Sequence, residues 1–495
     1  MHYYISFGLS LLLGLLVLLG SYVWVKSRTL NHIPGPILAR LTPLWLIYYA
    51  RIGKRYMAVE CAHKVYGDMV LISPNHVSIC HPEAIKAIYG NGPNALVKSQ
   101  FYNAFISLKP SVFSVIDSRE HTHRRRILSK AFSSTALQSF IPTMKHHVSA
   151  FTSKIDSIAA RSNTVDLLAF INYLTVDILS DLAFGAPLGF LEQESDLIAI
   201  KTSQGRHIEE HFSSMISERE HLAAVLGISS YFRYLSPILF DPFIRRARKS
   251  SSSLEQLAYS KVLERFCRGQ NKDDILQRLI DSHGTTEHHQ LGDRIEILTA
   301  ETVTLLIAGS DSTANSIAAI LHLVLIHPEV HKKLLLCLED AVGSHKGPIE
   351  FKQIANVAYL SATIIEGLRY HSINSIGLPR EVSSHGLVIL GKYLPPGTEV
   401  SVPAWTAHHS NHIWGDPQLF RPERWLESDI QQCFLGFGKG KRACIGKHLA
   451  QMQMQLILST IMLRYDMELE SKDLLSSEGF LNRLSELKVF LIVKA

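Results

Sequence analysis

One cysteine near the C-terminal end constrains this chain more than any other feature. Cys444 lies in the segment Phe437–Gly446, whose sequence is FGKGKRACIG. The glycines at positions 438 and 440 let the backbone approach a flat ligand where a Cβ atom would clash, and Gly446 removes side-chain bulk just after the cysteine. Such a loop suits a planar macrocycle that lies over it.

The cysteine is a candidate ligand for the iron of that macrocycle. A thiolate forms where positive charge or a helix N-terminus lowers the pKa of the thiol, and both Arg442 and the helix expected after Gly446 are placed to do so. A thiolate ligand on haem iron favours oxygen activation. The alternatives are a buried structural cysteine in a turn, or Cys433 as the ligand. Cys433 precedes the glycine loop instead of closing it, and we interpret it as structural.

The spacing Phe-x-x-Gly-x-Arg-x-Cys-x-Gly at residues 437–446 resembles the haem-binding signature of the cytochrome P-450 family, with every specified position matched. The resemblance implies that haem b is the cofactor, that Cys444 binds its iron, and that neighbouring residues contact it. Those neighbours are Phe437, Gly438, Arg442 and Gly446. The resemblance also implies a mainly α fold with a small β region over essentially the whole chain after the N-terminus.

The N-terminal segment is different in character. The segment from Ile5 to Val25 carries no charge and is long enough for one helix to span a bilayer. Lys26 and Arg28 follow at once, which places the next domain on the cytoplasmic side. The sequence predicts a membrane anchor (residues 1–28), a Pro-rich hinge (29–40) and one haem domain (41–495). The expected location is the endoplasmic reticulum membrane, crossed once.

Composition excludes several other classes of protein. A net charge of +6 on 495 residues argues against a nucleic-acid partner. The six cysteines show no disulfide-like spacing, as expected in a reducing compartment. The 25 histidines form no HExxH pattern.

Hydrophobic periodicity predicts a strand-turn-strand unit from Met69 to Ile79, and then mainly helices to about residue 370. Polar segments predict breaks near Gly185–Gly189, Ser250 and His283–Gly292. A later hairpin is predicted to pair Val388–Leu390 with Val400–Val402.

Two segments carry basic residues suited to haem propionates. On a predicted helix from Arg119 to Phe132, His121 and Arg125 are four residues apart and share one face. A solvated basic face is the alternative. The family pattern here is Trp-x-x-x-Arg, and this sequence has His121 in place of the tryptophan. Arg380 is a further propionate candidate.

The longest predicted helix, Asp293–Ile326, contains a carboxylate and a hydroxyl at Asp311 and Ser312. A buried carboxylate is costly without a partner, so function is a reasonable motive for it. In the family, an acid followed by threonine delivers protons for oxygen activation, and Ser312 replaces that threonine here. The alternative is a helix kink with a solvent-facing aspartate.

Glu366 and Arg369 are three residues apart on another predicted helix, and this spacing alone most often means a surface ion pair. The resemblance implies instead a structural network of Glu366, Arg369 and Arg424 beneath the haem, because Pro422-Glu423-Arg424 matches a second family motif.

Within the family, the segments Asp181–Gly185, Gly377–Arg380 and His408–Ser410 resemble the fungal group that includes benzoate para-hydroxylase. We therefore expect a monooxygenase with electrons from NADPH through NADPH-cytochrome P-450 reductase. A hydrophobic intermediate of secondary metabolism is the favoured substrate. Benzoate-type hydroxylation is one alternative, and a haem-thiolate isomerase or dehydratase is another. The predicted substrate-contacting segments are Asn94–Val115, Ile198–Leu226, Val303–Asp311, Ile373–Leu378 and Phe480.

Overall fold

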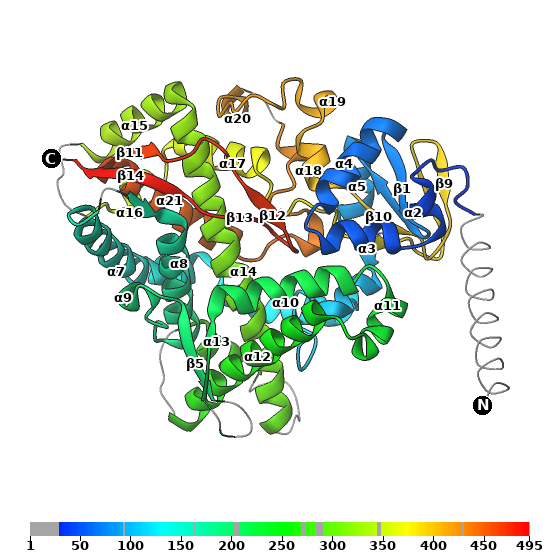
Figure 1. Ribbon diagram of the computed structural model, residues 1–495, viewed down its shortest axis with the longest axis horizontal. Coiled ribbons are helices and arrows are strands. Elements are labelled where there is room, and N and C mark those ends of the chain that lie inside the picture. Colours follow the sequence, from blue (N-terminus) through cyan, green and yellow to red (C-terminus); the bar gives the residue numbers. More distant parts are fainter. Residues whose placement is uncertain are drawn as a thin grey trace.

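The computed structural model describes residues 29–92, 95–162, 164–201, 205, 207–268, 274–283, 291–343, 348–427 and 430–494. Helices form most of this part of the chain, and the largest sheet lies beside the N-terminal helices (Figure 1). The predicted mainly α fold with a small β region is confirmed. The predicted anchor, residues 1–28, lies outside the described residues.

The helices are α2 (Ile37–Leu41), α3 (Leu44–Arg51), α4 (Arg55–Tyr66), α5 (Pro82–Tyr89), α6 (Ser118–Ala131), α7 (Ser134–Ala159), α8 (Leu167–Phe184), α9 (Phe190–Gln193), α10 (Phe212–Leu226), α11 (Ser230–Leu235), α12 (Pro242–Arg268), α13 (Ile275–His283), α14 (Leu291–Ile326), α15 (Pro328–Val342), α16 (Phe351–Ile354), α17 (Ala358–Tyr370), α18 (Ala404–His408), α19 (Asn411–Trp414), α20 (Arg424–Glu427) and α21 (Lys447–Arg464). Short 3₁₀ turns are η1 (Gln100–Phe105), η2 (Ser236–Ile238), η3 (Gln431–Cys433) and η4 (Gly440–Arg442).

The largest sheet has five strands in the order β1-β2-β10-β7-β3. These are β1 (Met69–Ser73), β2 (His76–Ile79), β10 (Glu399–Ser401), β7 (Arg380–Glu381) and β3 (Val97–Lys98). The predicted strand-turn-strand unit is therefore present as β1 and β2, which pair antiparallel. Strands β3 and β7 pair antiparallel with Lys98 opposite Arg380, so the pairing places two basic residues next to each other.

The predicted hairpin between Val388–Leu390 and Val400–Val402 is wrong. Strand β8 (Leu387–Ile389) pairs instead with its immediate neighbour β9 (Lys392–Leu394). The turn between them is Leu390-Gly391, and both residues have positive φ, 49° and 70°. That two-residue turn suits a tight hairpin better than the Pro395-Pro396-Gly397 segment. Strand β10 is free to pair with β2 and β7.

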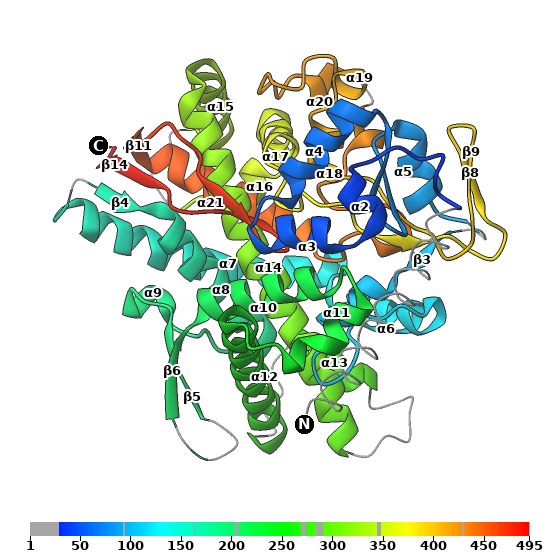
Figure 2. The ribbon, with the colours of Figure 1, turned by 45° about the vertical axis from the view of Figure 1, so that its right-hand side comes forward.

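One prediction in the helical region is also wrong, and one segment of that mainly helical region forms strands. Ser250 lies inside α12, where the structure shows no break. Residues 197–211 form a hairpin of β5 (Leu197–Lys201) and β6 (His207–His211), visible at the lower edge in Figure 2. Ile198, Ile200 and Ile208 are the more buried positions of that hairpin, which is the period-two pattern of strands.

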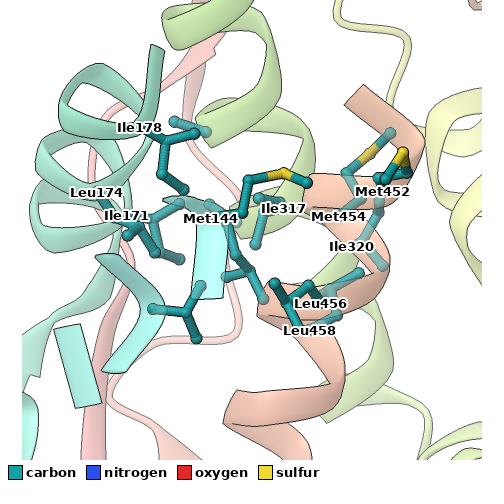
Figure 3. Close-up of a cluster of buried hydrophobic side chains, with 14 of the residues drawn as sticks. Met144, Ile171, Leu174, Ile178, Ile317, Ile320, Met452, Met454, Leu456 and Leu458 are labelled. Atoms are coloured by element: carbon teal, nitrogen blue, oxygen red, sulfur yellow. The ribbon is translucent and has the colours of Figure 1, made fainter. Parts of the chain in front are cut away.

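Helix α14 crosses the centre of the molecule, where α7, α8 and α21 pack around it. Side chains from all four helices point toward one another in Figure 3: Met144, Ile171, Leu174, Ile178, Ile317, Ile320, Met452, Met454, Leu456 and Leu458. A helix that is apolar on most of its surface is stable only when other elements cover it, as here. The same holds for α8, which has the length and hydropathy of a membrane span but is 67% buried within the fold.

The C-terminal strands complete the structure. Strands β11 (Tyr465–Leu469), β14 (Lys488–Val493) and β4 (Thr164–Asp166) form one sheet. Strands β12 (Ser476–Glu478) and β13 (Asn482–Leu484) form a hairpin that reaches α14, where the Leu484 N–H donates to Asn315 Oδ1 at 3.0 Å. This hairpin brings the end of the chain to the middle of the long helix.

Candidate active site

The loop before Cys444 is held in a conformation that requires glycine. Gly438 and Gly440 have φ values of 65° and 68°, in the left-handed region. A Cβ atom on Gly440 would lie 2.0 Å from the carbonyl oxygen of Tyr89, so no other residue fits there. The Cys444 N–H donates to the Phe437 carbonyl at 2.9 Å and closes the loop. Helix α21 begins just beyond, with Gly446 as its N-cap.

The Cys444 side chain is exposed, although the surrounding protein desolvates its thiol. That desolvation raises the pKa of Cys444, and a backbone N–H at Gly446 and the charges of Arg125 and Lys447 oppose it only in part. Arg442, which the sequence suggested for this role, instead donates to the carbonyls of Val115 and Ile116 at 2.7 and 2.8 Å. A bound metal cation would be needed to hold the sulfur as a thiolate.

Five basic side chains converge beside this loop: Lys98, His121, Arg125, Arg380 and Arg442. The pKa of His121 falls to about 3, first because it is buried and then because the four other cations surround it. Burial, Arg380 and Arg442 likewise hold the pKa of Lys98 well below its ordinary value. Cations packed this closely repel one another unless an anion lies among them. The two carboxylates of a haem would supply that charge, so these residues fit the cofactor.

Sequence reasoning did not identify Lys98 or Tyr102 at this site. Lys98 arrives because β3 pairs with β7, and its ammonium lies over the Tyr102 ring at 3.9 Å. Tyr102 accepts a hydrogen bond from Arg380 Nη1 at 2.8 Å, which orients that guanidinium. Arg125 donates to the Ala443 carbonyl at 2.8 Å, next to the ligand candidate. A single lysine or tyrosine gives no motif, and only the sheet pairing places them here.

Asp311 and Ser312 are neighbours in α14 but point to different partners. Arg483 Nε donates to Asp311 Oδ2 at 2.6 Å, and Asn315 Nδ2 donates to Asp311 Oδ1 at 3.1 Å. The Ser312 hydroxyl donates to the Ala308 carbonyl one turn back, at 2.5 Å. The structure therefore shows no hydrogen bond between Asp311 and Ser312. Arg483, from β13, is a partner that the sequence did not suggest.

Asp311 and Arg483 also line a cavity of about 610 Å³ between α8, α10, α14 and β13. Of the predicted site residues, only Asp311 lines it. Its wall includes many polar side chains, among them Asn172, Ser217 and His221. This cavity is separate from the Cys444 loop, none of whose residues lines it.

A row of less buried residues runs along another face of α14, and we call it the exposed row of α14. It consists of Thr304, Leu305, Ala308 and Ser312, of which Ala308 is exposed and the others are half-buried. Their spacing of three and four residues places them in one row. An exposed alanine in the middle of a helix that crosses the core indicates a face that protein does not cover. Gly309 is needed beside it for packing, because a Cβ atom there would lie 2.9 Å from the Leu179 side chain of α8.

Aromatic rings gather near this row, on the side of Tyr102. Phe105, Phe113 and Phe480 contact one another with ring centroids 4.8 to 5.7 Å apart. Tyr102 packs against Phe113 at 5.6 Å, and Phe101 against Phe105 at 5.4 Å. We call these five rings the aromatic cluster. Its rings come from two of the predicted substrate segments, Asn94–Val115 and Phe480. Residues of two further segments pack with it: Ala223, Ala224, Ile373 and Ile376. The β5–β6 hairpin belongs to a different cluster.

Glu366, Arg369 and Arg424 form one buried network. Arg369 donates to both carboxylate oxygens of Glu366 at 2.9 Å, and Arg424 Nε donates to Glu366 Oε1 at 3.0 Å. The three side chains are at most 2% exposed. Trp425 Nε1 adds a fourth side-chain donor to the same carboxylate, at 2.9 Å. Arg369 also donates to the carbonyls of His408 and Pro417, so the network joins α17 to the segment before the Cys444 loop.

A cysteine that closes a glycine loop beside five converging cations fits a haem protein with a thiolate ligand. Residues 36–489 match the family model for cytochrome P450, and the chain therefore belongs to the cytochrome P450 family. Members of this family are monooxygenases that use haem with cysteine thiolate ligation of the iron. The predictions of family, of enzyme class and of the haem cofactor are confirmed.

The relatives are fungal cytochrome P450 enzymes. A benzoate 4-monooxygenase of Aspergillus niger is 34% identical, over 98% of this chain and 96% of its own length. A pisatin demethylase of Fusarium vanettenii is 30% identical, over 90% of this chain and 87% of its own. A cytochrome P450 monooxygenase of Penicillium aethiopicum is 28% identical, over 99% of this chain and 98% of its own length. The similarity to a benzoate hydroxylase agrees with the predicted subgroup.

The buried network allows a direct test of its energetic role. Arg424→Ala leaves Glu366 paired with Arg369 alone and removes one of the two arginine partners of Asp416. We expect the free energy of unfolding to fall by about 3–5 kcal/mol, because a buried carboxylate loses a charged donor and the deleted side chain, only 2% exposed, leaves a cavity. Arg421→Ala is the control, since its side chain is 41% exposed and pairs only at the surface with Asp416 and Glu427. It should change stability by about 0.5 kcal/mol or less. Equal denaturant midpoints for the two variants would contradict this role.

Proposed function

We propose that this enzyme inserts one oxygen atom from O₂ into a hydrophobic small molecule, with Cys444 as the ligand to the iron of haem b. The observation that carries the proposal is the exposed Cys444 thiol beside the five-cation cluster. Bound haem supplies the oxygen activation. Lys98, His121, Arg125, Arg380 and Arg442 hold its propionates, and Phe437, Gly438 and Gly446 shape the loop beneath it.

The substrate lies between the exposed row of α14 and the aromatic cluster. Five aromatic rings favour an apolar, ring-containing molecule. The nearby buried arginines are already engaged: Arg219 with Glu220 and the Phe105 carbonyl, and Arg483 with Asp311. This supports a hydrophobic intermediate of fungal secondary metabolism. Benzoate-type hydroxylation is the second candidate, favoured by the 34% identical benzoate 4-monooxygenase.

Asp311 and Ser312 deliver protons to the oxygen-binding side of the haem. Ser312 belongs to the exposed row of α14, whereas Asp311 faces the polar cavity and Arg483. Water in that cavity would connect Asp311 to solvent, and the serine hydroxyl would pass the proton on. Because no hydrogen bond joins the two side chains, the step between them requires water or a turn of one side chain.

The electron donor is NADPH-cytochrome P-450 reductase, which docks on a basic face beside the Cys444 loop. Lys441, Lys447 and Arg126 are exposed and contribute to that face. Arg124, by contrast, is only 10% exposed and binds Glu120 and Glu301, so it takes no part. Complementary charge would steer the acidic flavoprotein and set the salt dependence of its association.

Residues 1–28 anchor the enzyme in the endoplasmic reticulum membrane, with residues 29–40 as a hinge and 41–495 as a cytoplasmic haem domain. Apolar side chains of α2 and α3 support this, because Ile37 is 78% exposed and Leu44 55%. The α11–η2 segment carries more, including Phe240 just after it at 99%. Helix α10 lies between α3 and α11 in Figure 2, and Ile47 of α3, Val225 of α10 and Phe232 of α11 pack in one cluster. A lipid surface would cover this apolar face.

The first test addresses the iron ligand. Cys444→Ala should abolish the thiolate-type absorption of the reduced carbon monoxide complex, because no other sulfur closes the glycine loop. Cys433→Ser is the matched control and should retain it, since Cys433 is a partly buried residue of η3. A normal spectrum from the Cys444 variant would exclude it as the ligand.

The second test addresses proton delivery. Asp311→Asn should slow turnover while haem and substrate still bind, because the amide keeps the shape without acid–base chemistry. Ser312→Ala should release reduced oxygen as peroxide and lower the ratio of product to NADPH consumed, whereas Ser312→Thr should be tolerated. Thr299→Ala is the control, because the Thr299 hydroxyl donates only to the Ile295 carbonyl of its own helix and Thr299 does not line the cavity. Unchanged coupling in the first two variants would leave these residues as helix packing.

The third test addresses the membrane. Deletion of residues 1–25 should leave a protein that still binds haem and partitions less strongly into membrane fractions. Replacing Tyr234 and Phe240 by Ser in the deleted protein should lower the residual membrane binding further, because it removes exposed apolar area. If the deletion alone fractionated like the full chain, the N-terminal segment would not be the main attachment.

A further inference from the structure

The segment between η1 and α6, residues 106–117, contains no helix or strand, and we call it the distal loop. Several side chains hold its backbone. Lys98 donates to the Phe113 carbonyl, and Arg442 donates to the carbonyls of Val115 and Ile116. Lys98 and Arg442 both belong to the group of basic residues that would hold the haem propionates. Helix α14 makes further side-chain hydrogen bonds to the distal loop, through Glu301 and Thr304.

Glu301 provides the strongest of the contacts from α14. The Val112 N–H donates to both of its carboxylate oxygens, at 2.9 and 3.1 Å. Arg124 Nη1 of α6 donates to Oε1 at 3.2 Å. The Glu301 side chain is only 3% exposed. One turn further along α14, the Thr304 hydroxyl donates to Ser111 Oγ at 2.7 Å.

The carboxylate fixes the backbone of a residue whose neighbour belongs to the aromatic cluster. Phe113 follows Val112, and its ring contacts Tyr102, Phe105 and Phe480. With the Val112 N–H held by Glu301 and the Phe113 carbonyl held by Lys98, the peptide between them has little freedom. The position of the Phe113 ring then follows from these two anchors.

We propose that Glu301 is a positioning residue that sets the shape of the substrate pocket by fixing Val112 and, through it, the Phe113 ring. The inference rests on the proposed function for the place of the pocket. Glu301 touches neither cofactor nor substrate, and it acts through the distal loop. A carboxyl group is suited to this task, because its two oxygens accept from both the Val112 N–H and the Arg124 guanidinium.

The charges around Glu301 make this anchor sensitive to pH near neutrality. Burial raises the pKa of Glu301 to about 7, opposed by the Val112 N–H and Arg124 and assisted by Glu120. Lys109 of the distal loop pairs with Asp293 and Glu296 instead. Above pH 7 the buried carboxylate is ionised. Because its pKa in the closed loop lies above that of a solvated carboxylate, opening of the loop is favoured as the pH rises. Below pH 7 the protonated carboxyl costs less to bury, so the loop is held more tightly as the pH falls.

The experiment uses the haem-loaded enzyme and compares Glu301→Gln and Glu301→Ala with Glu296→Gln. Glu296 lies on the same helix and reaches the same loop through Lys109, but its side chain is 42% exposed. The first measurement is hydrogen exchange of residues 106–117. Exchange should accelerate about tenfold in Glu301→Ala, which leaves Val112 without its acceptor, and hardly change in Glu296→Gln.

The second measurement is the Kd of 4-phenylimidazole, from the change in haem absorption. The ratio of the Glu301→Gln value to the wild-type value cancels the titration of the ligand itself. We expect a ratio near one at about pH 6, where wild-type Glu301 is protonated and the amide resembles it, falling to about one tenth near pH 8, where the ionised carboxylate loosens the loop. A residue with a purely structural role would give a ratio that does not change with pH.

Unchanged exchange in Glu301→Ala, or a ratio independent of pH, would overturn the inference. Should the variants fail to take up haem, the wild-type enzyme still decides. The protection factor of the Val112 amide, corrected for intrinsic exchange, should fall between about pH 6 and pH 8, and a constant value rejects the proposal. Neither exchange measurement depends on turnover, so failure here is distinct from failure of Cys444→Ala to lose its thiolate spectrum.

Discussion

Repulsion among buried cations is the constraint on which this active site depends. Lys98, His121, Arg125, Arg380 and Arg442 come from separate parts of the chain. Burial, and after it the neighbouring cations, lowers the pKa of Lys98, His121 and Arg442. Packing them together is unfavourable unless an anion lies among them. Haem propionates supply that charge, and binding of the cofactor is therefore expected to stabilise the folded chain.

The network around Glu366 follows the opposite principle. There, one carboxylate is shared by Arg369 and Arg424, and the remaining guanidinium N–H groups donate to backbone carbonyls and to Asp416. Every charge finds its partner within the chain, which is the mark of a structural cluster. The contrast separates two kinds of buried charge in one protein. A cluster complete in itself holds the scaffold, and a cluster lacking its counter-charge binds a ligand.

Features that depend on neighbouring residues in the sequence could be predicted, whereas features that depend on contacts between distant segments could not. The Cys444 loop, the β1–β2 unit and helix α14 are local patterns, and each lies where its residues predicted it. Lys98 reaches the site because the distant strands β3 and β7 pair, and Arg483 because the C-terminal hairpin contacts α14, and no spacing in the sequence encodes either contact. The hairpin at Leu390-Gly391 was missed for a local reason, because a non-glycine residue with positive φ gives little turn signal.

Arg483 also changes how proton delivery has to be understood. While Arg483 donates to Asp311 Oδ2 at 2.6 Å, that oxygen is engaged, so proton delivery through it requires the contact to open. Phe480 of the aromatic cluster lies in the turn between β12 and β13, three residues before Arg483. A substrate that presses on Phe480 would therefore act on the same short hairpin that holds Asp311. Substrate binding would in this way be linked to the opening of the contact between Asp311 and Arg483.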